Sequence, residues 1–94
     1  MTGADGSSAV DSSTRAWDAW TRGDRSEAER LSVAATRALT FANRRERQLV
    51  EIVRLAITGH AARAHDLASE HLSEFPHDVL VVRVRTACAA GLEG

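Results

Sequence analysis

The stretch from Gly59 to Pro76, "GHAARAHDLASEHLSEFP", contains the pattern that decides the fold. Glycine is favoured directly after a helix, because it adopts the left-handed backbone conformation that ends one. The apolar residues that follow recur at helical spacing, and they are Ala64, Leu67, Ala68, Leu72 and Phe75. Proline cannot continue a helix, so the stretch predicts a helix that begins just after Gly59 and stops at Pro76.

The same pattern occurs thirty-six residues earlier in the chain. Gly23 precedes Gly59 by this interval, and Ala28 precedes Ala64 by the same interval. The apolar residues before the two glycines also align at this spacing. A period in the mid-thirties with two helices per unit is typical of a helical solenoid, in which a small alanine lets the two helices of a unit approach closely.

The first unit is expected to contain two helices. Ser12 or Ser13 caps the first, which ends at the glycine before Asp24. Asp24 or Ser26 caps the second, which continues to Ala42. Short polar side chains are favoured at these positions because they accept hydrogen bonds from free backbone N–H groups.

The second unit starts with a clear capping signal. Asn43 followed by Glu46 forms a capping-box pattern that opens a third helix, ending near the glycine of the quoted stretch. After that stretch, Asp78 can cap a fifth helix over residues 79–90. Residues 82–85 alternate between valine and arginine, so a strand is the alternative for this segment, although nothing else in the chain offers it a partner.

These elements predict an all-α chain, an α-solenoid of helical hairpins with about five helices. Residues 1–10 are poor in apolar side chains and are expected to be a disordered tail. The helical domain then covers residues 11–94. It divides into repeat one at 11–42, repeat two at 43–77 and a half repeat at 78–91.

The repeat resembles a known type. The pattern "G-H-A-A-R-A…HLSEFP" looks like the second half of a tetratricopeptide (TPR) repeat, with Gly59, Ala64 and Pro76 on its signature positions. The longer segment "LTFANRRERQLVEIVRLAITGHAARAHDLASEHLSEFPHDVLVV", Leu39 to Val82, is similar to the N-terminal part of the tetratricopeptide repeat protein 38-like family. This resemblance implies a TPR-like α-solenoid with no catalytic residues to carry over.

Composition excludes several classes of protein. The formal net charge is −1, which argues against a general nucleic-acid or anionic-membrane binder. Cys88 is the single cysteine, so no internal disulfide forms and a reducing compartment is expected. The chain has no apolar run long enough to span a membrane and no signal-peptide pattern at its start. We therefore expect a cytoplasmic protein.

The four histidines do not form a metal site at their spacing. His60 and His71 point the same way on a helix but lie about 16 Å apart along it. His65 points in a different direction from both, and His77 follows the proline. His71 falls within the apolar stripe, so a hydrogen-bonded core or interface histidine is expected. Cys88 lies in no nucleophile motif and is expected to be a buried structural thiol. From the histidines and the cysteine together, we assign no catalytic residue, cofactor or metal ligand, and we expect no enzyme.

Three arginines crowd the first turn of the third helix. They are Arg44, Arg45 and Arg47, where the helix dipole disfavours cations. An antiparallel hairpin would bring this turn beside the end of the fourth helix. We therefore expect ion pairs with Glu70 and Glu74 in preference to a phosphate or nucleic-acid contact.

An apolar surface is the feature that could carry a function. The candidate partner-binding residues are Trp17, Trp20, Leu49, Val50, Val53 and Ile57. They predict a protein–protein interaction module that binds a peptide or helix of another protein in an apolar groove. The alternative for the two tryptophans is that they fill the core. The alternative function is an accessory or truncated helical part of a larger TPR protein or enzyme complex.

The last expected helix is apolar around much of its circumference. Val79, Val82 and Val84 belong to a side with no partner helix in the sequence that follows. An exposed apolar strip marks an interaction surface, so we expect residues 79–90 to pack against another chain. The simplest case is a two-fold homodimer, and the other is a larger protein that supplies the helix.

Overall fold

The computed structural model describes residues 5–41 and 43–93, and these ranges contain helices and no strand. The chain is therefore all-α. The α-helices are α1 (Asp5–Thr21), α2 (Arg25–Arg37), α3 (Arg44–Ile57), α4 (Ala61–Glu74) and α5 (Val79–Glu93), and a 3₁₀ helix η1 (Ala38–Phe41) follows α2. Across the described ranges, no helix combines the length and apolar character that a membrane crossing requires.

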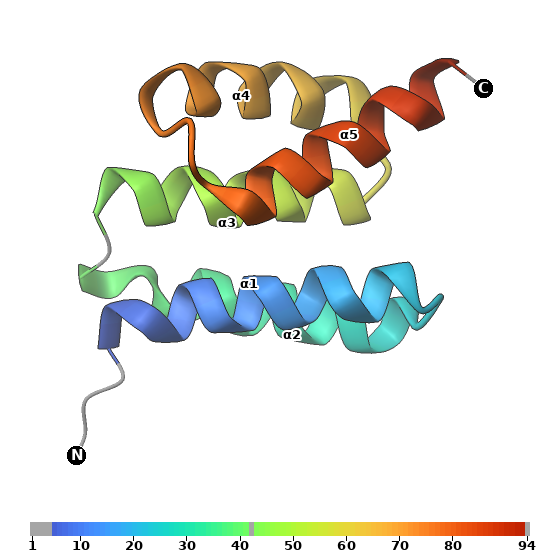
Figure 1. Ribbon diagram of the computed structural model, residues 1–94. Coiled ribbons are helices and arrows are strands. Elements are labelled where there is room, and N and C mark those ends of the chain that lie inside the picture. The colour runs from blue at the N-terminus through green and yellow to red at the C-terminus, as the bar shows by residue number, and fades with distance from the viewer. Residues whose placement is uncertain (1–4, 42, 94) are drawn as a thin grey trace.

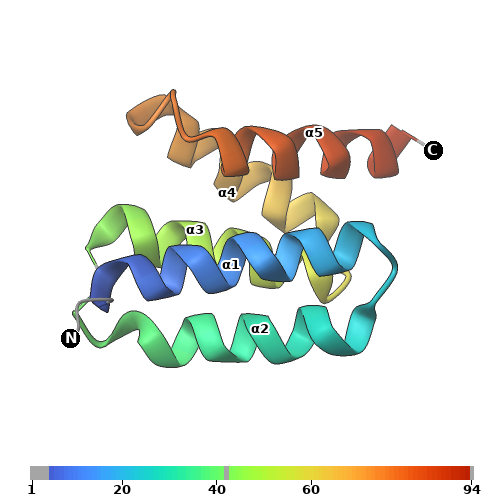
Figure 2. The ribbon, with the colours of Figure 1, turned by 60° about the horizontal axis from the view of Figure 1, so that its bottom comes forward.

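The helices stack as successive hairpins. α1 and α2 form one antiparallel hairpin, and α3 and α4 form the next (Figure 1). α5 packs on α4 and α3, on the side of the molecule opposite α2 (Figure 2). α3 is the central helix, because it contacts each of the other four α-helices. Its buried side chains accordingly include Leu49, Ile52 and Val53, which are among the largest fully buried side chains of the described structure.

The two predicted glycine turns are present and have the same geometry. Gly23 has φ +85° and Gly59 has φ +90°, in the left-handed region that favours glycine. In each turn the residue after the glycine donates its N–H to a carbonyl five residues earlier. These bonds join Asp24 to Ala19 and His60 to Leu55, each at 2.9 Å. The glycines therefore end α1 and α3 in the same way and set the sharp return of each hairpin.

The predicted caps are confirmed for α2 and α3. The carboxylate of Asp24 accepts a hydrogen bond from the N–H of Glu27 at 3.2 Å. Asn43 and Glu46 form the full capping box, with bonds of 2.9 and 3.1 Å. Short-range hydrogen bonds therefore determine where these two helices begin.

The expected disorder of residues 1–10 is wrong for residues 5–10. α1 begins at Asp5, so the predicted cap at Ser12 or Ser13 is also wrong, and residues 1–4 lie outside the described residues. Ala9 is fully buried in a small cluster with Ala35 and Val50. These contacts link α1 to segments far away in the sequence, and small side chains allow the close approach. Local composition therefore could not reveal them.

The predicted continuation of the second helix to Ala42 is also wrong. α2 ends at Arg37 and the chain tightens into η1, while Ala42 lies outside the described residues. The N–H of Ala38 is shared between nearby carbonyls, including those of Ala34 and Ala35. Such sharing is typical of a helix end that changes to 3₁₀ geometry.

The segment after Asp78 is a helix, so the alternative of a strand is wrong. Leu80, Val81, Val84 and Cys88 are buried, and they lie on one side of α5. Residues at this spacing lie on one side, facing the supporting helices α3 and α4, only if the segment is a helix. Burial against α3 and α4 therefore decides the conformation of a segment whose local pattern is ambiguous.

The predicted close contact between the helices of each hairpin is present. Ala28 in α2 and Ala64 in α4 are both fully buried. Ala16, Ala19 and Ala68 are fully buried in the same core cluster. Alanines at these interfaces leave the larger side chains of α3 to fill the space between the hairpins.

Candidate functional site

Most of the predicted groove residues lie in the core. Trp17, Leu49, Val50, Val53 and Ile57 are each 4% exposed or less. They therefore contact the chain's own helices rather than an open groove. For Trp17 the alternative that the indole fills the core is correct. The sequence showed that these residues share helix faces but could not show which face the hairpins cover.

Trp20 lies at the edge of the core. Its indole is half-buried and packs against the main cluster. The guanidinium carbon of Arg25 lies 5.2 Å from the ring centroid, on the other side of the Gly23 turn. This cation–π contact covers part of the indole and leaves Trp20 a poor anchor for a partner.

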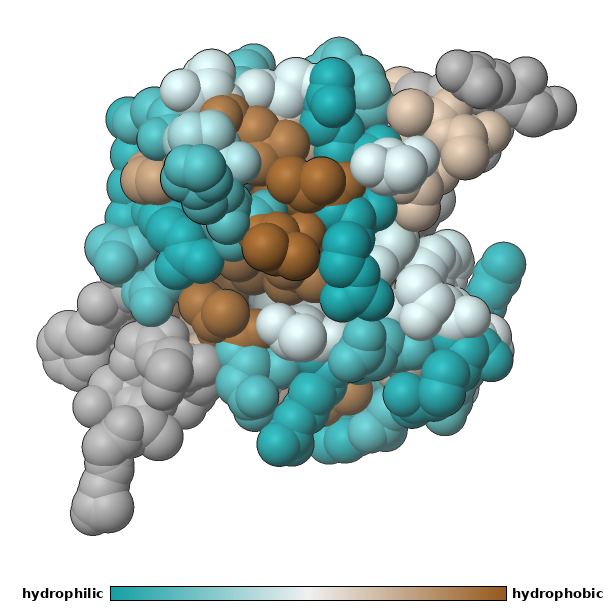
Figure 3. All heavy atoms as spheres, viewed as in Figure 1, coloured by the Kyte–Doolittle hydropathy of each residue, from teal (hydrophilic) through white to brown (hydrophobic). Residues whose placement is uncertain are grey.

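An apolar surface is nevertheless exposed on the face formed by α1, α3 and α5, here called the α1–α3–α5 face. Figure 3 shows apolar side chains gathered over α3 and α5, with hydrophilic side chains around them. Val79 is 68% exposed and Val82 is 42% exposed. Val84 is fully buried. Of the three valines that were expected to be exposed on this helix, Val79 and Val82 are therefore exposed and Val84 is not.

Two arginines flank the exposed valines of α5. Arg83 lies 3.5 Å from the carboxylate of Asp18 in α1, and both side chains are about half-exposed. Arg85 donates a hydrogen bond of 2.8 Å to the hydroxyl of Ser69 in α4. The apolar strip of α5 therefore lies between two positive charges.

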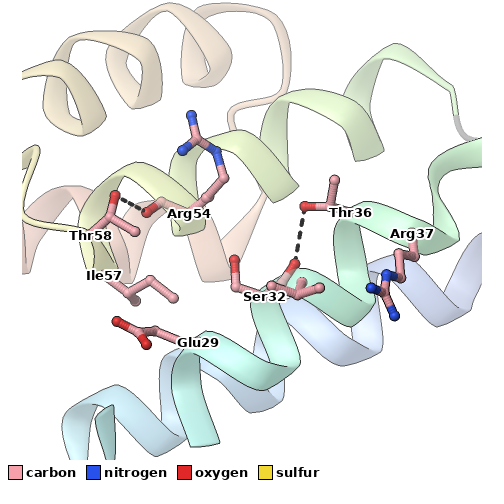
Figure 4. Close-up of a pocket in the computed structure, with 8 residues that line it drawn as sticks. Glu29, Ser32, Thr36, Arg37, Arg54, Ile57 and Thr58 are labelled. Atoms are coloured by element: carbon pink, nitrogen blue, oxygen red, sulfur yellow. Dashed lines mark hydrogen bonds between the residues drawn. The ribbon is translucent and has the colours of Figure 1, made fainter. Parts of the chain in front are cut away.

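A second surface feature is a hollow between α2 and α3, with a volume of about 500 Å³. Figure 4 shows Glu29 and Arg37 toward opposite ends of its α2 side, with Ile57 at the end of α3 and Thr58 directly after it. The residues around it are Glu29, Ser32, Val33, Thr36, Arg37, Arg54, Ile57 and Thr58. Ile57 is the one predicted groove residue that borders this hollow.

The charges around the hollow differ in how they are used. Arg54 donates two hydrogen bonds to the carboxylate of Glu51, and this contact raises the pKa of the Arg54 guanidinium. The hydroxyl of Thr36 is bonded to the carbonyl of Ser32. No ion pair within the described residues involves Glu29 or Arg37.

A buried polar cluster fixes the start of α5. His71, in the last turn of α4, is fully buried, and its Nε2 lies 2.7 Å from Oδ2 of Asp78. Its Nδ1 lies 2.8 Å from the amide oxygen of Gln48 in α3. Arg45 donates two hydrogen bonds to the carboxylate of Asp78, at 3.0 and 2.9 Å. Four side chains from three segments thus satisfy one another's polar groups.

The expectation of a hydrogen-bonded core histidine is confirmed for His71, but its partners were not predicted. Asp78 was expected to cap α5. Its carbonyl does accept the N–H of Val82 at the start of α5, while its carboxylate contacts Arg45 and His71. A buried histidine needs partners for both ring nitrogens, and that requirement was the available signal. Which residues meet it depends on the hairpin geometry.

The predicted pairing of the arginine cluster is confirmed for Arg44, whose guanidinium lies 2.8 Å from the carboxylate of Glu74. Arg45 pairs with Asp78, which is neither of the two predicted carboxylates, Glu70 and Glu74. Because the side chains of Arg44 and Glu74 are both well exposed, this pair contributes little to stability.

The described residues offer no constellation for metal binding. Within them, no three His, Cys, Asp or Glu side chains lie close enough together to hold an ion. Cys88 is buried, as expected, and burial raises the pKa of its thiol. A raised pKa lowers the thiolate fraction, which is the opposite of the activation that a nucleophile needs.

No protein-family model, curated protein or solved structure matches this chain. The large hydrophobic residues that the described structure exposes are Val33, Val79 and Val82.

Proposed function

We propose that this chain is a protein–protein interaction module without chemistry of its own. It is a TPR-like α-solenoid that works in the cytoplasm. Three features support the repeat: the thirty-six-residue spacing, the identical turns at Gly23 and Gly59, and the buried alanines Ala28 and Ala64. The order of packing also fits, since α3 contacts both helices of the hairpin before it and α5 does the same.

The observation that carries the proposal is the exposure of Val79 and Val82 on the α1–α3–α5 face. The opposite side of α5 is packed on α3 and α4, and this packing leaves the two valines toward solvent. An apolar strip on a helix that is already formed binds a partner without the entropic cost of folding that helix. The first helices of successive TPR units line one face, and α1, α3 and α5 are those helices here.

The partner that fits this face is a helix of another protein with apolar and acidic side chains. Its apolar side chains would cover Val79 and Val82, and its carboxylates would approach Arg83 and Arg85. A two-fold contact between two copies of α5, the homodimer expected from the sequence, would bring arginines of both copies together. We therefore favour a different protein at this surface.

The alternative function is an accessory helical part of a larger TPR protein or enzyme complex. In that case the helix covering α5 would belong to the protein that carries the further repeats. The same surface is used in both cases, and the identity of the bound protein distinguishes them.

Affinity capture from cells that produce the protein tests the proposal. We expect the unchanged chain and the Val33→Glu variant to retain one stoichiometric partner. We expect Val79→Glu and Val82→Glu to lose it, because each places a carboxylate against the apolar and acidic side chains of the proposed partner. Val33 is a matched control, since it is a valine of similar exposure (50%) on α2.

The result that would contradict the proposal is equally specific. A partner retained by both α5 variants would exclude the α1–α3–α5 face as the binding surface. Capture only of a protein that carries additional TPR repeats would favour the alternative function. Circular dichroism of each variant checks that the helices are intact.

A further inference from the structure

The solvent-facing side of α2 presents three residues spaced one turn apart, Glu29, Val33 and Arg37, here called the α2 stripe. All three are exposed, and Val33 is 50% exposed. The opposite side of α2 carries the buried residues Ala28, Ser32 and Ala35. At the rise of an α-helix, the two charges lie about 12 Å apart along the axis, with the valine midway between them.

The charges of the α2 stripe form no ion pair with the residues that the structure describes. Neighbouring charges are paired, Glu27 with Arg30 and Glu51 with Arg54. Among the described residues, no ion pair uses Glu29 or Arg37. Val33 is one of three large hydrophobic residues exposed in the described structure, and the other two are on α5.

The order acid, valine, base is complementary to itself when reversed. If a second α2 lies antiparallel to the first with a two-fold axis at Val33, each Glu29 faces the Arg37 of the other copy. The two Val33 side chains then meet on the axis. Every contact away from the axis occurs twice, as an isologous interface requires. The hollow of about 500 Å³ beside Val33 leaves room for side chains of the second helix between α2 and α3.

We propose that the α2 stripe is the self-association surface of this protein and that its occupant is a second copy of the chain. Charge complementarity selects this occupant: the same three residues supply both halves of each ion pair. The contact between two α5 helices lacks this property, because Arg83 and Arg85 flank the exposed valines there. The proposal is independent of the proposed function, since it leaves the α1–α3–α5 face of both copies free.

The size of the contact sets the expected strength. A single pair of short helices buries less surface than a standard interface, so the dimer should be weak. We expect a dissociation constant between about 10 µM and about 1 mM, because small contacts of this kind are typically transient. A dimer of this strength would present two partner-binding faces at high local concentration.

Charge reversal and charge exchange test the proposal directly, by sedimentation equilibrium. Glu29→Arg places two arginines opposite each other at both ends of the contact, and Arg37→Glu places two glutamates there. We expect each variant to weaken the dimer by at least about tenfold, since two attractions become two repulsions. The double variant Glu29→Arg, Arg37→Glu restores both ion pairs and should dimerise like the unchanged chain.

A mixture of the two single variants provides a further test of the proposed contact. The Glu29→Arg chain carries two positive ends and the Arg37→Glu chain carries two negative ends, so they should form a heterodimer although neither dimerises alone. Val33→Glu should abolish association by placing two carboxylates on the axis. Val82→Glu, on α5, is the matched control and should leave the dimer unchanged.

The following outcomes would overturn the proposal. The unchanged chain could be a monomer up to about 1 mM, which is the upper limit expected for such a contact. The double variant could be folded by circular dichroism and yet fail to recover the dimer, or the single variants could dimerise as before. Loss of the dimer in Val82→Glu with retention in Val33→Glu would place self-association on α5.

Discussion

At the scale of single residues, His71 shows how a polar side chain is accommodated in a core of small apolar ones. Its ring is fully buried, and both nitrogens lie within hydrogen-bonding distance of oxygens of Asp78 and Gln48. Asp78 is in turn held by two bonds from Arg45. Such a cluster stabilises the fold only while it is complete, because a buried group without a partner keeps its full desolvation cost.

This dependence gives a prediction for Asp78→Ala. The change leaves Nε2 of His71 without its partner and removes both bonds of Arg45, so we expect a loss of about 2–3 kcal/mol in the free energy of unfolding. Glu74→Ala is the control, because it breaks the exposed pair with Arg44 and should cost less than about 1 kcal/mol. Urea denaturation of both variants measures the difference. Equal costs would show that the buried cluster is not important for stability.

At the scale of secondary-structure elements, the glycine turns organise the chain. Gly23 and Gly59 have positive φ, and an added Cβ would meet nothing within 4 Å at either position. The requirement for glycine is therefore conformational and does not come from a lack of space.

We expect Gly59→Ala to lower the free energy of unfolding by about 1 kcal/mol, because a residue with a Cβ is strained in the left-handed region. Gly91 makes a matched comparison, since it lies inside α5 and a Cβ there also meets nothing within 4 Å. Gly91→Ala should raise stability by about 0.5 kcal/mol, because alanine favours the helix. Thermal denaturation should show shifts of opposite sign, and a loss of stability in both would contradict this account.

At the scale of the whole molecule, the fold depends on packing around α3. Every other α-helix contacts it, and α5 completes the stack by burying Leu80, Val81 and Val84. Cys88 is buried in the same core cluster. Detachment of α5 would expose the thiol, so the reactivity of Cys88 reports the stability of this contact.

Thiol labelling at about pH 8 should therefore be slow in the folded chain, because burial blocks access and raises the pKa of Cys88. Val81→Ala should accelerate labelling by about 30-fold, which corresponds to about 2 kcal/mol of lost packing. Val82→Ala should change the rate by less than about threefold, because Val82 is 42% exposed and most exposed substitutions have small effects. Similar rates for the two variants would show that α5 is not held by the side that carries Val81.

The sequence alone determined the features that depend on neighbours along the chain. The turns at Gly23 and Gly59 and the capping box at Asn43 involve partners within five residues, and so they were predictable. The buried alanines Ala28 and Ala64 followed from the repeat that these turns define.

Only the tertiary structure decided the features that depend on distant segments. The start of α1 at Asp5 depends on contacts of Ala9 with α2 and α3, and the partners of His71 come from two other segments. Tertiary packing also buried Trp17 and left Val82 exposed, although both lie on apolar helix faces. The physical reason is that helical periodicity shows which side chains share a face, while the burial of that face depends on which helix packs against it.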